Sequence, residues 1–286
     1  MTDSFLELKG VYKKFPDFTL NNINFSLPKG YIMGLVGPNG AGKTTTIQLI
    51  LNMLEKDAGE ILVFGKDNVK SENIIKQNVG VVFDNLFYAD SWTIKDTEKA
   101  VSIFYDHWKP DVFGKMVSRF HLPLGKKVGE FSRGMQIKLM LACAFSHDAR
   151  LLILDEPTSG LDPVTRDEFL EILQDYIKDG ERSVLFSTHI TTDLERVADY
   201  ITLINQGELF FTGSMEDLMN RYRLIKGKLR DLTPALENSI LGIRKTDMGF
   251  EGLIDTNEAT KYKNCVIDTP SIDDVVIHVS KGGAKK

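Results

Sequence analysis

The sequence lacks the features of a disulfide-stabilised or membrane-spanning chain. Only two cysteines occur in 286 residues, and Cys143 and Cys265 have neither C-x-x-C spacing nor a histidine cluster beside them. This excludes a disulfide framework and a zinc site, and it fits reduced thiols in a cytoplasmic protein. The longest uninterrupted apolar run covers only residues 139–145, whereas a membrane-spanning helix needs about 20 such residues. We therefore do not expect the chain to cross a bilayer by itself.

The sequence also lacks an export signal and an excess of basic residues. Residues 1–7 contain neither a basic segment nor an apolar one of the kind that signal peptides carry, so export is not expected. The formal net charge is −5, and no strongly basic balance points to a general nucleic-acid binder. Hydrophobic residues make up 42% of the chain, which suffices for the core of one large domain or two small ones.

A glycine-rich segment at residues 37–45 matches the pattern G-x-x-x-x-G-K-[ST] at every fixed position. Its members are Gly37, Pro38, Asn39, Gly40, Ala41, Gly42, Lys43, Thr44 and Thr45. The apolar run at 31–36 predicts a strand before it, and helical spacing at 44–54 predicts a helix after it. In such a loop backbone N–H groups point at phosphate oxygens, Lys43 reaches the β- and γ-phosphates, and Thr44 offers a hydroxyl to Mg²⁺. The alternative, a glycine-rich turn without a ligand, is disfavoured because all fixed positions and both flanks match.

A second group of candidate residues follows two other predicted strands. Residues 151–154 are continuously apolar, as in a central parallel strand, and Asp155 and Glu156 follow directly. Carboxylates at the carboxyl end of such a strand face the phosphate loop, where Asp155 can hold Mg²⁺ and Glu156 can take a proton from an attacking water. The simpler interpretation is that two acids cap a turn. His189 ends the strand predicted at 183–188, where the γ-phosphate is expected to lie.

The remaining patterns predict an α/β fold with a parallel-sheet centre. Alternating residues at 5–9 and 23–27 predict an antiparallel β-subdomain, and 59–65 and 79–83 predict further strands. Helical spacing from about 93 to 145 predicts a helical insertion. Asp162 and Pro163 begin another predicted helix, and Gly207 joins a predicted terminal hairpin.

The sequence divides into a domain at 1–222 and an accessory region at 223–286. Short alternating runs at 262–268 and 275–279 predict a small C-terminal β-containing appendage. We find no chemical constellation in that region, and we expect it to be regulatory or to stabilise a dimer.

Taken together, these motifs resemble, over about residues 4–222, the nucleotide-binding subunit of ATP-binding cassette transporters, a family with a P-loop NTPase core. The resemblance implies that ATP and Mg²⁺ are bound, that residues 37–45 are the Walker A loop, that Asp155 and Glu156 are the Walker B aspartate and catalytic glutamate, and that His189 is the switch histidine. Phe15 matches the aromatic that stacks on adenine, although an aromatic at that place is more often part of a core. Ser132 and Gly134 match the signature positions that meet the γ-phosphate.

The sequence departs from the family pattern at two motifs. Phe131, Arg133 and Met135 stand where the usual signature has Leu, Gly and Gln. Asp84 stands where the family usually has the Q-loop glutamine, so it is either a metal-linked residue or a turn former. The signature with an appended C-terminal region resembles bacterial exporters whose permeases are separately encoded.

The resemblance implies a nucleotide-sandwich dimer, formed with an identical or a related subunit, and attachment to a transmembrane permease. The protein is then expected on the cytoplasmic, inner face of the membrane, with no nucleic-acid partner. The alternative is a soluble cassette ATPase acting on ribosomes or DNA, but the tandem cassettes or long coiled-coil insertions usual in that class are not found here. A P-loop GTPase or kinase would leave the signature, Glu156 and His189 unexplained.

Overall fold

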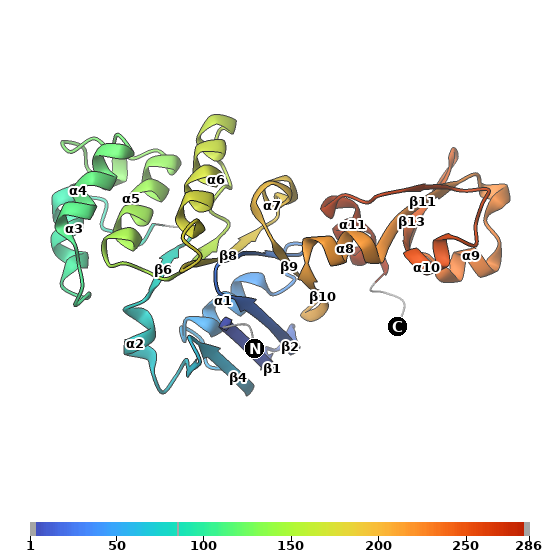
Figure 1. Ribbon diagram of the computed structural model, residues 1–286, viewed down its shortest axis with the longest axis horizontal. Helices are drawn as coiled ribbons and strands as arrows, with labels where there is room; N and C mark the ends of the chain where they lie inside the picture. Colours follow the sequence, from blue (N-terminus) through green and yellow to red (C-terminus); the bar gives the residue numbers. More distant parts are fainter. Residues whose placement is uncertain (1–3, 85, 283–286) are drawn as a thin grey trace.

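The computed structural model describes residues 4–84 and 86–282. Its framework is a ten-stranded mixed sheet with the strand order β5-β4-β1-β2-β10-β9-β3-β8-β7-β6 (Figure 1). The strands of this sheet are β1 (Ser4–Lys14), β2 (Thr19–Pro28), β3 (Ile32–Val36), β4 (Ala58–Val63), β5 (Lys66–Asp67), β6 (Val79–Val82), β7 (Leu151–Asp155), β8 (Ser183–Thr188), β9 (Tyr200–Asn205) and β10 (Glu208–Ser214).

The centre of the sheet is parallel and buried on both faces, as the sequence predicts. Strands β9, β3, β8, β7 and β6 run side by side in one direction. On β7, Leu151 and Ile153 belong to one core cluster, whereas Leu152 and Leu154 belong to the other. A continuous apolar run results because successive side chains of a strand point to opposite faces, and here both faces are covered.

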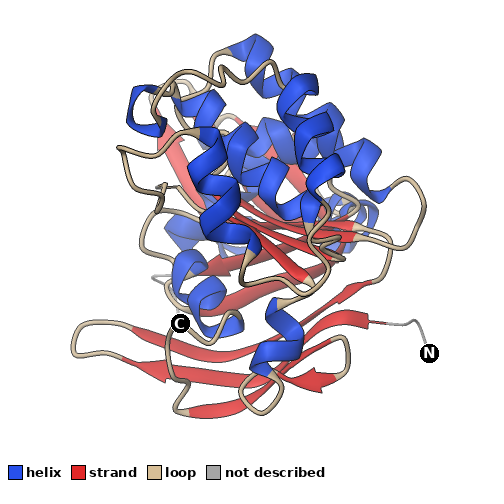
Figure 2. Ribbon diagram, turned by 90° about the vertical axis from the view of Figure 1, so that its left-hand side faces the viewer, coloured by secondary structure: helices blue, strands red, loops and turns tan. Residues whose placement is uncertain are grey.

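The antiparallel β-subdomain forms the other half of the sheet. Strand β1 pairs with β2 on one side and β4 on the other, both antiparallel. Figure 2 shows helices concentrated over one part of the molecule and long strands at the opposite end, where the chain's first strand lies. The predicted terminal hairpin is also confirmed, since β9 and β10 are joined at Gln206 and Gly207, which both have positive φ.

The helical insertion lies far from the C-terminal region in Figure 1. It contains α3 (Ile94–Ser102), α4 (Pro110–Arg119), the 3₁₀ turn η1 (Val128–Glu130) and α5 (Arg133–Ser146). The other helices of the first 221 residues are α1 (Lys43–Ile50), α2 (Glu72–Lys76), α6 (Pro163–Ile177), α7 (Thr191–Val197) and α8 (Met215–Arg221). Asp162 caps α6 as predicted, accepting hydrogen bonds from the Val164 and Thr165 N–H groups.

The C-terminal region forms a second, four-stranded sheet of order β12-β13-β11-β14. Its elements are β11 (Tyr222–Gly227), the 3₁₀ turn η2 (Leu229–Asp231), α9 (Pro234–Ser239), β12 (Leu241–Thr246), β13 (Gly249–Asp255), α10 (Thr256–Ala259), β14 (Val266–Asp268) and α11 (Ile272–Gly282).

One predicted strand of this region is wrong. Residues 275–279 lie within α11 rather than in a strand. Ile272, Val275 and Val279 are spaced as one face of a helix, and all three are buried in the core cluster that also contains helices of the insertion. Over five residues, alternation and helical spacing cannot be told apart by period alone. Of the predicted run at 262–268, only Val266–Asp268 forms a strand.

Among the residues that the structure describes, no helix is long and apolar enough to span a membrane.

Candidate functional site

The site lies at one edge of the sheet, where four neighbouring parallel strands end. Val36 of β3 is aligned with Thr188 of β8, and Asp155 of β7 is aligned with Ser187 of β8. Leu154 of β7 is aligned in turn with Val82 of β6. The residues that follow these strands therefore meet at the same edge, as expected for the carboxyl ends of a parallel sheet.

The phosphate loop connects β3 to α1, and at Gly42 it leaves no room for a side chain. Gly42 precedes α1 with a φ of 112°, and a Cβ atom there would lie 2.8 Å from Leu20 Cδ1 and 3.0 Å from Phe18 Cζ. No side chain caps the α1 N-terminus and no acid lies in its first turn. Its first N–H groups thus remain available to an anion, which the helix dipole also favours.

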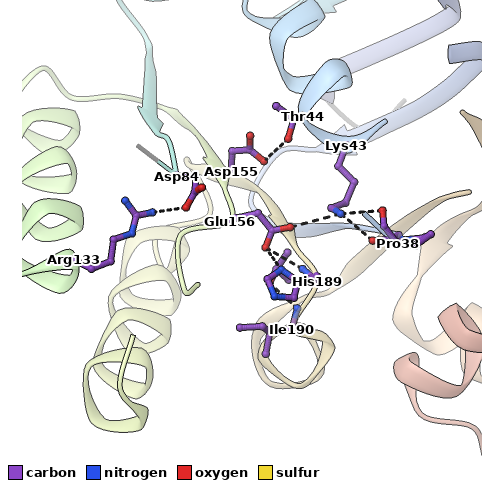
Figure 3. A network of polar contacts seen from close by, with 11 residues as sticks. Pro38, Lys43, Thr44, Asp84, Arg133, Asp155, Glu156, His189 and Ile190 are labelled. Atoms are coloured by element: carbon purple, nitrogen blue, oxygen red, sulfur yellow. Dashed lines mark hydrogen bonds and ion pairs between the residues drawn. The ribbon is translucent and has the colours of Figure 1, made fainter. Parts of the chain in front are cut away.

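Lys43, Glu156 and His189 form one contact network at this edge (Figure 3). Lys43 is buried, and its Nζ donates to Gly37 O at 2.9 Å and lies 3.6 Å from Glu156 Oε1. The other carboxylate oxygen, Glu156 Oε2, lies 2.6 Å from His189 Nδ1 and accepts the His189 backbone N–H at 3.1 Å. Because an ionised carboxylate only accepts, His189 Nδ1 carries the proton in this contact.

Glu156 is held in an unusual backbone conformation. Its φ is 52°, in the left-handed region that costs a non-glycine residue about 1 kcal/mol or more. Its backbone N–H is fixed by Ser187 O at 2.9 Å. Glycine would adopt this conformation without strain, so a glutamate here is explained by what its side chain contacts.

Thr44 and Asp155 form a pair that fits a divalent cation. Thr44 Oγ1 lies 3.4 Å from Asp155 Oδ1. Asp155 is buried, and this burial raises the pKa of its carboxyl group. A carboxylate and a hydroxyl at the mouth of a phosphate loop are oxygen ligands of the kind that Mg²⁺ takes, and a cation would offset the cost of burying the charge.

Asp84 follows β6 at the same edge of the sheet, but its carboxylate contacts Arg133 rather than the Thr44–Asp155 pair. Arg133 Nη2 donates to Asp84 Oδ1 at 3.0 Å. Within residues 4–84 and 86–282, no group of three or more acids, histidines or cysteines is arranged to hold a metal ion. The two departures from the family pattern thus contact each other, which the separate motifs gave no reason to expect.

The cavity over the phosphate loop has a volume of about 660 Å³, a size usual for small-molecule sites. Its lining comprises Asp17, Phe18, Asn39, Gly40, Ala41, Gly42, Lys43, Thr44, Thr45, Asp84, Glu156, Ser159 and His189. The aromatic in this lining is Phe18, whereas Phe15 lies beside it with ring centroids 6.2 Å apart. Asp17 and Phe18 were not among the residues predicted from the sequence. The only available signal was that they share a short segment with Phe15.

Ser132 and Gly134 lie outside this cavity. Ser132 is the N-cap of α5, and its Oγ accepts the Met135 N–H at 3.3 Å. Gly134 lies against α6, where an added Cβ would be 2.9 Å from Thr165 Cγ2. Neither residue is therefore brought to the phosphate loop of its own chain.

Comparison with known proteins finds similar sequences. A family model described as ABC transporter matches residues 20–159. The ABC transporter ATP-binding protein NatA of Bacillus subtilis is 32% identical over 211 residues, covering 71% of this chain and 85% of NatA. The bacitracin transport ATP-binding protein BcrA of Bacillus licheniformis is 32% identical over 208 residues, covering 72% of this chain and 68% of BcrA.

Solved structures agree on the fold. The ATP-binding subunit of an ABC transporter superimposes with a TM-score of 0.69 at 25% identity, covering 75% of this chain and 92% of that one. The structure of cbiO1 from Clostridium perfringens, described as part of the ABC transporter complex cbiONQ, gives a TM-score of 0.62 at 22% identity, covering 76% of this chain and 90% of that one.

Proposed function

Because this chain belongs to the family of ABC transporter ATP-binding proteins, we propose that it binds Mg-ATP at the carboxyl ends of the parallel strands. We propose further that ATP hydrolysis at this site energises a separately encoded permease. Binding and hydrolysing ATP to drive transport is the activity of the family. The residue assignments rest on one observation, the contact network of Lys43, Glu156 and His189. These residues follow the strands β3, β7 and β8, which lie side by side in the sheet.

The geometry supports a distinct role for each residue at the phosphates. Lys43 and the N–H groups of residues 39–45 bind the phosphate oxygens, and the buried position of Lys43 strengthens its attraction for them. Glu156 accepts a proton from the attacking water, while His189 orients the Glu156 carboxylate through Nδ1. Thr44 and Asp155 would hold Mg²⁺, and the bound cation would neutralise charge that develops on the phosphates.

We further propose that the adenine base stacks on the aromatic pair at the cavity mouth. Phe18 packs against the phosphate loop, and Phe15 lies next to it at an interplanar angle of 34°. Both rings are half-buried, and Phe18 lines the cavity beside the phosphate site, where an adenine could stack on it.

The signature residues Ser132 and Gly134 lie outside the cavity of their own chain, which supports a role at a second subunit. We propose that they complete the ATP site of the other chain in a dimer. The names of relatives that carry out bacitracin transport or Nod factor export support an exporter, with its ATPase on the cytoplasmic face of the membrane. The domain division at residue 222 is part of the same proposal.

The test of this function is purification from membranes in mild detergent, with and without ATP. We expect a multi-span permease to co-purify and to stimulate the ATPase activity. Co-purification of ribosomes or DNA instead would support the alternative, a soluble cassette ATPase, and would contradict the transport role.

Removing Asp84 and removing Arg133 are predicted to shift the Mg²⁺ requirement of the ATPase in opposite directions. If Asp84 contacts Mg²⁺ through water, Asp84→Ala raises the Mg²⁺ concentration for half-maximal ATPase by about tenfold, as loss of an outer-shell metal contact typically does. Arg133→Ala frees the same carboxylate from its ion pair, so it lowers that concentration, by less than about fivefold because exposed pairs are weak.

Magnesium titration of the steady-state ATPase rate measures both shifts. Asp84→Gln is the matched control, which keeps an oxygen acceptor and retains much of the wild-type response. Shifts of equal size and direction in Asp84→Ala and Arg133→Ala would contradict a metal-linked role and leave only the ion pair.

A further inference from the structure

Helix α11 of the C-terminal region packs directly on the element that follows His189. Ile272 and Val275 of α11 are fully buried in the same core cluster as Leu194 of α7. Leu194 in turn lies over the phosphate-loop strand, since a Cβ on Gly34 would be 2.7 Å from its Cδ1. One small helix thus separates the C-terminal region from β3.

Two reciprocal hydrogen bonds join the N-terminal turn of α11 to α7. The Thr191 hydroxyl, at the first position of α7, donates to Asp273 Oδ1 at 2.7 Å. In the opposite direction, the Ile272 N–H of α11 donates to Glu195 Oε1 at 2.9 Å. This N–H has no carbonyl partner inside its own helix, so Glu195 acts as its cap. A third contact, from Asn205 Nδ2 to Val279 O at 3.2 Å, fixes the far end of α11 beside β9.

The first turn of α7 packs on β3 through Leu194, but its N-terminus lacks a side-chain cap. Its N-cap residue, Ile190, supplies no capping side chain. The helix covers only Thr191–Val197, too short to be stable alone. Thr191 is 3% exposed and follows His189 by two positions. The contact with Asp273 therefore helps to fix the path of the backbone just beyond the histidine that contacts Glu156, together with the Ile190 N–H, which donates to Thr188 Oγ1 at 2.9 Å.

We propose that Asp273 and Thr191 are positioning residues, through which helix α11 holds His189 in register with Glu156 and makes ATP hydrolysis depend on the C-terminal region. This inference rests on the proposed role of His189. It assigns to the C-terminal region a role in catalysis rather than in binding ATP, since none of its described residues, 223–282, lines the cavity over the phosphate loop.

The test compares kcat and KM for ATP in Asp273→Ala, Asp273→Asn and Thr191→Val. We expect Asp273→Ala and Thr191→Val each to lower kcat about tenfold, the scale of one hydrogen bond to a charged group, with KM within about twofold of wild type. Asp273→Asn keeps an acceptor oxygen and restores most of the rate. The double variant is expected to be no slower than either single variant, because both remove the same contact.

Asp268→Ala is the matched control. Asp268 is another acid of the C-terminal region, hydrogen-bonded to Lys226 at 2.9 Å within the four-stranded sheet, and its removal is expected to leave kcat unchanged. Thermal melting of every variant verifies that it is folded.

The decisive comparison repeats Asp273→Ala in a His189→Ala background. If Asp273 acts through His189, adding Asp273→Ala to His189→Ala causes no further loss of kcat. The positioning role would be overturned if the fold-losses of kcat in the two single variants multiplied in the double variant. A wild-type kcat in Asp273→Ala alone would overturn it as well. A wild-type kcat in His189→Ala alone is a different failure, because it would remove His189 from the proposed site itself.

Discussion

Glu156→Gln is expected to bind ATP like the wild type but to hydrolyse it about 10²- to 10⁴-fold more slowly, the usual loss when a general base is removed. The amide retains an oxygen that accepts from His189 Nδ1, so the contact at 2.6 Å survives while the proton acceptor is lost. In the proposed dimer the variant should accumulate as an ATP-bound pair of subunits.

Steady-state ATPase assays measure the rate, and size-exclusion chromatography with ATP measures the dimer. Glu181→Gln is a suitable control because Glu181 also pairs with a lysine, Lys29, at 2.6 Å, but lies just before the amino end of β8, at the opposite edge of the sheet. A Glu156→Gln protein that hydrolyses ATP at the wild-type rate would contradict the general-base assignment.

Lys43→Ala is expected to lose most of the stabilisation that Mg-ATP gives to the fold. Ligand at about 100 times its dissociation constant adds roughly 2.7 kcal/mol to the native state. For a chain of this size that is a rise of about 5 to 10 °C in Tm. Without Lys43 the phosphates lose a buried positive charge, so affinity falls and the shift becomes small.

Differential scanning fluorimetry with and without Mg-ATP measures the shift. Lys29→Ala is the control, since Lys29 is a paired lysine away from the cavity and should leave the full shift. Equal shifts in the wild type and in Lys43→Ala would mean that residues 37–45 do not bind the phosphates as proposed.

The parallel centre of the fold and its chemistry were predictable because both depend on local patterns. The continuous apolar run at 151–154 identified a strand buried on both faces, and the acids after it had to lie at the carboxyl edge. His189 could be placed for the same reason. The strand order did not have to be known to place these residues, because the carboxyl ends of all parallel strands lie at the same edge of the sheet.

Contacts between distant segments could not be predicted in this way. The pairing of Asp84 with Arg133 depends on how the helical insertion packs beside β6, and no local pattern encodes that packing. Phe18 was overlooked because the chain turn from Phe15 to Phe18, closed by a hydrogen bond of 2.7 Å, decides which ring faces the cavity. In the C-terminal region, alternation and helical spacing coincide over a few residues, so period alone did not distinguish β-strand from α11.

The burial of α11 against the first part of the chain has a consequence for biosynthesis. Leu194 of α7 shares a core cluster with Ile272, Val275 and Val279, so the part of α7 that α11 covers stays open on a nascent chain until the last of those residues leaves the ribosome. Synthesis of residues 223–279 takes on the order of ten seconds. During that interval the site at the carboxyl ends of the parallel strands can already form, while an apolar face beside it is open to chaperones.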